Sequence, residues 1–214
     1  MDILAILRDK LDFIRDFYKT ASAPFLAIKS KIENQEDPFT YDGGPTEEPP
    51  HLLAWTRADE SLNILGECCL SLVQRSFKDY LMGFIKDTWN EPLPKGNDWF
   101  KTYNVFFRKH SIDWEKGPVD MSLLEELNLA RNTIQHWGGE HDIYRIQRTQ
   151  NAKYYARFPQ GLFVNEVDKQ MWSRSARVLP ARIEVTSEKL QAAIQAVDDL
   201  CCFIDQSPRG GPGR

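Results

Sequence analysis

The chain has 214 residues, with 31 acidic and 27 basic side chains and a formal net charge of −4. This length supports one well-packed domain or two small ones. A mildly acidic chain has no general attraction for nucleic acid, although a local basic patch can still bind phosphate. No stretch approaches the roughly 20 apolar residues that cross a bilayer, which argues against a membrane-spanning protein.

The N-terminal residues lack the pattern of a signal peptide, because charged side chains interrupt the first apolar residues and no small-residue cleavage site follows. The cysteines form two neighbouring pairs, Cys68–Cys69 and Cys201–Cys202. Adjacent cysteines rarely bond to each other, and their spacing does not match a zinc site. We therefore expect four reduced thiols, a cytoplasmic location, and neither a metal nor another cofactor.

The first predicted element is a long helix with an apolar stripe. Between Leu7 and Ile32 the apolar residues recur at alternating steps of four and three, and Pro24 is expected to kink the helix. The stripe resembles a heptad seam, which either packs on the rest of its own domain or pairs with a second subunit; we expect the first. Residues 34–56 then form a long linker rich in proline, glycine and acids.

Three further helices follow the linker. Thr56 and Asp59 resemble a capping box that starts a helix reaching to about Trp89, with Leu62, Leu65, Cys69, Leu72, Phe77, Leu81 and Phe84 on its inner face. Asn97 is expected to cap a third, aromatic helix with Trp99, Tyr103, Phe106 and Phe107 in its core-facing stripe. A second capping box, Ser122 with Glu125, starts a fourth helix whose inner face holds Leu123, Leu127, Ala130 and Ile134 and which ends at Gly138–Gly139.

Residues 140–185 have a different pattern. The segment 154–164 predicts two short strands around Pro159 to Gly161, and residues near Ile183 predict a third. Thr186 or Ser187 is expected to cap a last helix with Leu190, Ile194, Val197, Cys201 and Ile204 turned inward. The prediction is an all-α protein with one helical domain over 1–206, a small extended insertion at about 140–185, and a disordered tail over 207–214.

The fourth predicted helix carries the candidate functional residues, in the sequence ELNLARNTIQHWGG at 126–139. Arg131 is followed directly by Asn132 and, at the end of the amphipathic helix, by His136. This arrangement resembles the HEPN superfamily (higher eukaryote and prokaryote nucleotide-binding domains), closely over 122–138 and loosely over the helical body. The resemblance implies a HEPN-like helical bundle that forms a homodimer and acts as a metal-independent endoribonuclease. It also implies a toxin–antitoxin or defence context, with an antitoxin such as a small nucleotidyltransferase as regulatory partner.

The three residue types suit RNA cleavage by the neighbouring 2′-hydroxyl. His136, whose pKa is ordinarily about 6.5, can move protons at cellular pH. Arg131 can place its planar fork on phosphate oxygens, and Asn132 can orient the histidine or bind the backbone. On an ideal helix, positions 131 and 136 point about 140° apart. Either the helix therefore unwinds just before His136, or two subunits share the site across a two-fold axis, as the resemblance implies.

Two other interpretations remain open. In one, the chain is a non-catalytic HEPN-like module that binds nucleotides or a protein. In the other, Arg131 pairs with Glu126 and His136 caps the helix C-terminus, so that both residues are structural. The basic side chains of the insertion are either a solvated surface or RNA contacts; the candidates for RNA contact are Arg145, Arg148, Lys153 and Arg157.

Overall fold

The computed structural model describes residues 2–41, 50–96, 98–135, 153–166, 169 and 183–208. Helices dominate these residues, which confirms the all-α prediction. The strands predicted over 154–164 and near Ile183 are wrong: residues 153–157 are helical, and in the described chain β-type pairing is limited to a single bridge between Val164 and Ile183. None of the helices described is long and apolar enough to span a bilayer.

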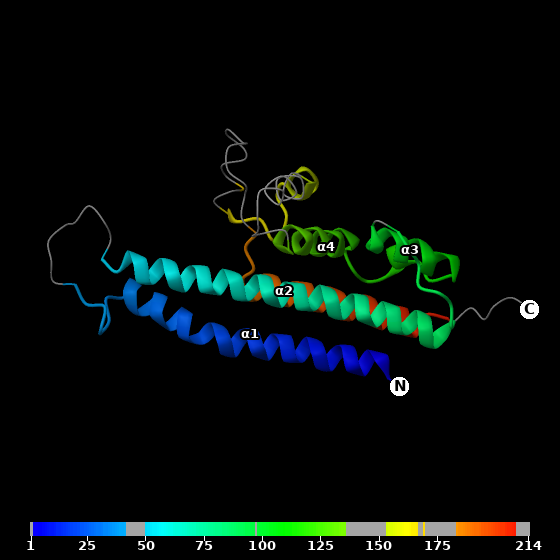
Figure 1. Cartoon of the computed structure of the whole chain (residues 1–214), viewed down its shortest axis with the longest axis horizontal. Coiled ribbons are helices and arrows are strands. Elements are labelled where there is room, and N and C mark those ends of the chain that lie inside the picture. The colour runs from blue at the N-terminus through cyan, green and yellow to red at the C-terminus, as the bar shows by residue number, and fades with distance from the viewer. Residues whose placement is uncertain are drawn as a thin grey trace, which may run out of the picture.

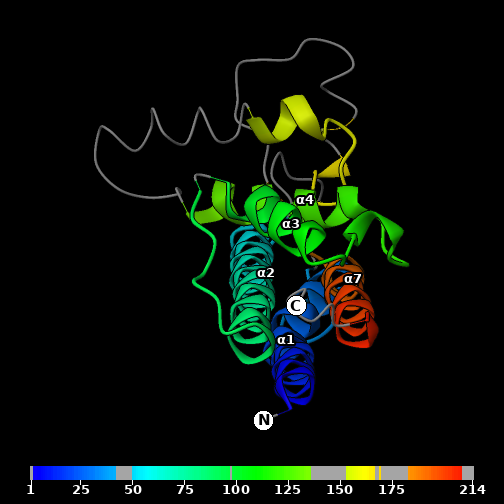
Figure 2. The ribbon, with the colours of Figure 1, turned by 90° about the vertical axis from the view of Figure 1, so that its right-hand side faces the viewer.

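Three long helices form the base of the fold (Figure 1), namely α1 (Ile3–Glu33), α2 (Leu52–Thr88) and α7 (Ser187–Gln206). The helices α1 and α2 are antiparallel. Their register is fixed by ion pairs between Lys10 and Asp79 at 3.5 Å and between Lys29 and Asp59 at 2.6 Å. Figure 2 shows α1, α2 and α7 end-on as a triangle, with a second layer covering the side formed by α2 and α7.

The second layer consists of α3 (Trp99–Lys109), a 3₁₀ turn (Trp114–Lys116) and α4 (Met121–Gln135). The helix α4 contacts both α2 and α7. In the aromatic stripe of α3, Tyr103 and Phe107 are buried, and Trp99 and Phe106 are partly buried against the core. Trp114 of the 3₁₀ turn is fully buried, and its ring lies 5.3 Å from that of Phe107. This stripe is therefore not exposed for base stacking.

The helices α1 and α7 follow their sequence patterns closely. The predicted stripe of α1 is buried from Leu7 to Tyr18 and half-buried beyond, and the helix continues through Pro24. Thr186 caps α7, because its hydroxyl accepts a hydrogen bond from the Lys189 amide at 3.4 Å. All the predicted inward residues of α7 are buried: Leu190, Ile194, Val197, Cys201 and Ile204.

The predicted helix starts and one inner face need correction. The helix α2 begins at Leu52, after His51 in the left-handed conformation, and Asp59 pairs with Lys29 instead of capping it. Leu72, expected inside, is 40% exposed. Asp98 caps α3, whereas Asn97 lies outside the described residues. For α4, the Asp120 carboxylate accepts from the Ser122 amide at 2.8 Å, in place of a capping box formed by Ser122 and Glu125.

Candidate functional site

The helix α4 is buried on more faces than its apolar pattern predicts. Leu124 is fully buried where Leu123 was expected, and Leu123 and Ile134 are only partly buried. On one face Asn128 accepts hydrogen bonds at Oδ1 from the Trp99 indole at 2.7 Å and the Gln74 amide at 3.4 Å. These polar contacts connect α4 to α3 in its own layer and to α2 in the base layer.

On another face of α4, Glu126 holds the segment 153–166. Its carboxylate is in a side chain only 5% exposed, and Oε1 accepts from the Tyr154 hydroxyl at 2.6 Å and the Phe163 amide at 2.9 Å. Burial raises the pKa of Tyr154, and the nearby Glu126 carboxylate raises it further, so the phenol stays protonated and donates. Gly161 lies so close that a Cβ there would collide with Oε1.

Arg131 lies one turn beyond Leu127 and Asn128, and it is half-buried. Its Nη1 donates to Asn132 Oδ1 at 3.4 Å, and its Nε is buried without a hydrogen-bond partner. Burial lowers the pKa of this guanidinium, since desolvation disfavours the charged form. No carboxylate of the described residues pairs with it. Glu126, which the structural interpretation expects to pair with Arg131, instead accepts hydrogen bonds from Tyr154 and Phe163.

The remaining predicted site residues are only partly placed. His136, Arg145 and Arg148 lie outside the described residues, as does the predicted helix end at Gly138–Gly139. Lys153 is exposed. Arg157 pairs with Glu125 at 3.0 Å. This contact is six residues before Arg131, or about 9 Å along the helix axis, so the structure does not bring the two arginines together through it.

Glu126 and Tyr154 were not among the predicted site residues, although a signal exists for the first. Glu126, Ala130 and Thr133 follow one another at steps of four and three, and all three are buried. A helix face made of small residues allows another chain segment to approach closely, and an acid on such a face needs donors there. Nothing comparable marks Tyr154, because its partner is 28 residues away in the chain.

The thiols of the structure are unpaired. All four cysteines are free. Cys69 and Cys201 are buried, and burial raises the pKa of Cys69 to about 11. Among the described residues no group of three histidine, cysteine, aspartate or glutamate side chains is arranged to hold a metal ion.

Comparison with known proteins assigns no family. No protein-family model matches the chain, and neither a curated protein nor a solved structure matches it.

Proposed function

We propose that the C-terminal part of α4 binds the phosphate backbone of RNA and cleaves it, as a metal-independent endoribonuclease of the HEPN type. The observation that supports this most is Arg131. Leaving a guanidinium half-buried with an unpartnered Nε costs stability, because the group loses water without gaining a hydrogen bond. A phosphate oxygen supplies the missing acceptor, and the charge-assisted bond is of the strong kind.

In the proposed reaction the 2′-oxygen attacks the adjacent phosphorus, and the bond from phosphorus to the 5′-oxygen breaks. The 2′-hydroxyl gives its proton to a base, and the departing 5′-oxygen takes one from an acid; His136 is assigned to this proton transfer. Arg131 stabilises the negative charge that builds on the phosphate oxygens. The products are a 2′,3′-cyclic phosphate and a 5′-hydroxyl.

Asn132 has the role of a positioning residue in this proposal. Its Oδ1 accepts from Arg131 Nη1, which restricts rotation of the guanidinium, while Nε is without a hydrogen-bond partner. A fixed fork loses less conformational freedom when it binds a phosphate. Lys153, which is exposed, remains a candidate for contact with RNA further from the cut.

The wider setting is proposed from the resemblance at 131–136 alone. It comprises a cytoplasmic homodimer, an antitoxin that restrains it, and a toxin–antitoxin or defence role. The second candidate function is a HEPN-like nucleotide-binding or protein-interaction module without catalysis. The unpartnered Arg131 also favours that function, since binding an anion requires no proton transfer.

The two functions separate in one experiment. Purified full-length protein is incubated with total RNA in EDTA, beside His136→Ala and Arg131→Lys variants of equal thermal stability. The ribonuclease proposal predicts cleavage by the wild type and a sharp loss in both variants. The His136→Ala variant lacks the group that transfers protons, and in Arg131→Lys the lysine keeps the charge but lacks the planar guanidinium that binds two phosphate oxygens. Binding without cleavage, lost only on changing Arg131, would support the non-catalytic module instead.

A further inference from the structure

Lys78 lies where the three helices around the candidate site meet. It is half-buried on α2, and its ammonium stands over the ring of Trp99 on α3, 5.7 Å from the ring centroid. The same ring donates its indole hydrogen to Asn128 of α4 at 2.7 Å and packs edge-on against Phe77 of α2. Because the ring is held on these sides, it restricts the position of the ammonium above it.

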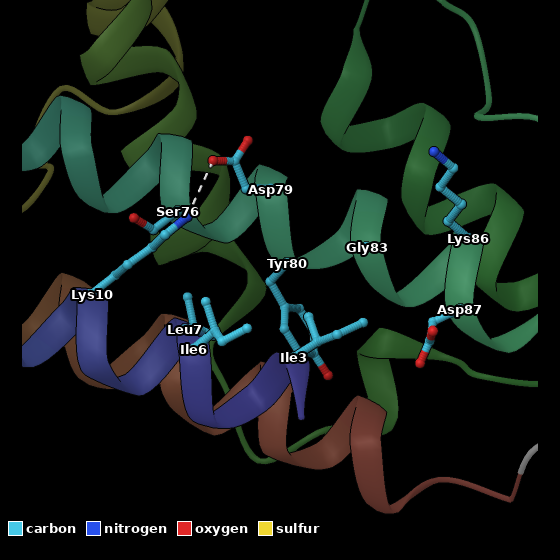
Figure 3. Close-up of a pocket in the computed structure, with 10 residues that line it drawn as sticks. All are labelled: Ile3, Ile6, Leu7, Lys10, Ser76, Asp79, Tyr80, Gly83, Lys86 and Asp87. Carbon is cyan, nitrogen blue, oxygen red and sulfur yellow. Dashed lines mark ion pairs between the residues drawn. The ribbon is translucent and has the colours of Figure 1, made fainter. Parts of the chain in front are cut away.

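No carboxylate of the described residues pairs with Lys78. Its neighbour Asp79 points toward α1 and pairs there with Lys10 at 3.5 Å (Figure 3). Asp98, which caps α3, lies 3.7 Å from the Lys101 ammonium. The aromatic ring below Lys78 attracts a cation but accepts no conventional hydrogen bond, so the three donors of the ammonium can bind an anion.

The guanidinium of Arg131 lies on the same side of α4 as this junction. On a helical wheel Arg131 and Asn132 fall about 60° and about 40° to either side of Asn128. Arg131 Nη1 donates to Asn132 Oδ1, so the guanidinium is drawn over the side of α4 that Asn128 occupies. Asn128 also accepts from the Gln74 amide of α2 at 3.4 Å, which places Asn128 and Gln74 level with each other.

Lys78 and Arg131 stand a short distance apart along the bundle. Lys78 follows Gln74 by about 6 Å along the axis of α2, and Arg131 follows Asn128 by about 4.5 Å along α4. The two cations are therefore within roughly 11 Å of each other along the helix axes. Between them, Asn128 accepts from both Gln74 and Trp99, so these side chains bind one another. Two cations with no unpaired base-reading group between them suit contact with a sugar–phosphate backbone.

We propose that Lys78 is a second phosphate-binding residue of the site on α4, and that single-stranded RNA passes from Arg131 along α2 to Lys78. This path rests on the proposed function, since it extends the strand that Arg131 holds. A flexible single strand can fit its phosphates to two fixed cations and turn a 2′-oxygen toward the phosphorus, whereas base pairing fixes the backbone. Both residues belong to one chain, so the path is the same whether one or two subunits form the cleavage site.

Fluorescence anisotropy with a labelled single-stranded RNA of about 15 nucleotides measures the contact. Every protein in the series also carries His136→Ala, so that the probe stays intact. Lys78→Gln, at unchanged thermal stability, is expected to raise the dissociation constant about fivefold at low salt and to reduce the slope of log Kd against log salt by about 0.7. Lys78→Arg keeps the charge and should restore both values. The control is Lys19→Gln, at an exposed lysine of α1, which Figure 2 shows on the far side of the bundle from α4.

A scan of the RNA backbone locates the contact. Uncharged methylphosphonates replace the phosphates of the probe one at a time. At one position Lys78→Gln should have no further effect, because the charge that Lys78 binds is already absent. The same scan with Arg131→Met should identify a different phosphate close by. A fully paired RNA of equal length should bind more weakly than the single strand, and tighter binding of the duplex contradicts the single-stranded path.

The outcomes separate this contact from the proposed function. Unchanged affinity and salt slope in Lys78→Gln, while Arg131→Met weakens binding, overturns the role of Lys78 and leaves the ribonuclease proposal standing. RNA that binds with the expected dependence on Lys78, but that the protein with His136 intact never cuts, keeps the path and removes the ribonuclease. A chain that binds no RNA overturns both.

Discussion

Tyr154 and Glu126 are joined by a 2.6 Å hydrogen bond across 28 residues of chain. Both side chains are buried, and the same carboxylate oxygen also accepts from the Phe163 amide. Three residues before α7 begins, the Glu184 amide donates to the Phe163 carbonyl at 2.9 Å. Glu126 therefore determines how the segment 153–166 is held against both α4 and the start of α7.

Removing the carboxylate should destabilise the fold far more than removing its neighbour. Glu126→Ala leaves the Tyr154 hydroxyl and the Phe163 amide buried without an acceptor, at a cost of about 3 kcal/mol. Glu125→Ala is the matched control: it breaks only an ion pair with the exposed Arg157, and should cost less than about 1 kcal/mol. Urea unfolding of both variants measures the difference, and equal losses would contradict the assigned role of Glu126.

The raised pKa of Tyr154 predicts a dependence of stability on alkaline pH. The folded state keeps the phenol protonated, whereas the unfolded chain releases the proton near the ordinary pKa of 10.0. The contribution is fully present below that pH and is lost as the pH rises above it. Tyr154→Phe should therefore start less stable but lose stability less steeply above pH 10. Parallel slopes for the two proteins in that range would count against a buried, protonated Tyr154.

Sequence periodicity was a good guide wherever one face of a helix meets the core. The inward residues of α7 and the first four residues of the α1 stripe, Leu7 to Tyr18, are buried as predicted, because a helix on the surface of the core needs only one apolar face. Periodicity failed where a tertiary contact decides the conformation. The segment from Tyr154 is predicted to be a strand, yet a helical turn there brings the Tyr154 hydroxyl to Glu126.

The candidate site was predicted from its residue types, but its environment was not. The sequence identifies Arg131 and Asn132 as neighbours on a helix. It does not show that Arg131 Nε would be buried without a partner, because that depends on how α4 packs. The groove of about 330 Å³ between α1 and α2 (Figure 3) could not be predicted from the sequence either, because it depends on the register of two helices, which the Lys10–Asp79 ion pair sets.

Arg131 is expected to lower the stability of the fold and to raise its affinity for RNA. Arg131→Met keeps most of the side-chain volume and removes a desolvated, unpartnered cation. We expect stability to be unchanged or raised by about 1 kcal/mol, while RNA affinity falls at least about tenfold. Thermal unfolding and fluorescence anisotropy with labelled RNA measure the two effects. Arg108→Met, at an exposed ion pair on α3, is the control for general charge. A clear loss of stability in Arg131→Met would indicate a structural arginine.

The cysteines should differ in reactivity according to their burial. Cys68 is exposed, whereas Cys69 and Cys201 are buried and their pKa values are raised by burial. Iodoacetamide at neutral pH is expected to modify Cys68 first and the two buried thiols only on unfolding. A reducing agent should leave the melting temperature unchanged, since no disulfide links these residues. Peptide mass spectrometry over time follows each thiol, and early labelling of Cys201 would contradict its position in the core.

The central claim, that the end of α4 cleaves RNA through the neighbouring 2′-hydroxyl, is tested most directly with a synthetic RNA. Once a cut is mapped in total RNA, the same sequence is prepared with one 2′-deoxy sugar on the 5′ side of the cut. Both forms are incubated with the wild type in EDTA, and the products are analysed by mass spectrometry. The account predicts a cyclic phosphate and a 5′-hydroxyl from the all-RNA strand and no cut at the deoxy position. Equal cleavage of the two strands, or cleavage undiminished in His136→Ala, would contradict it.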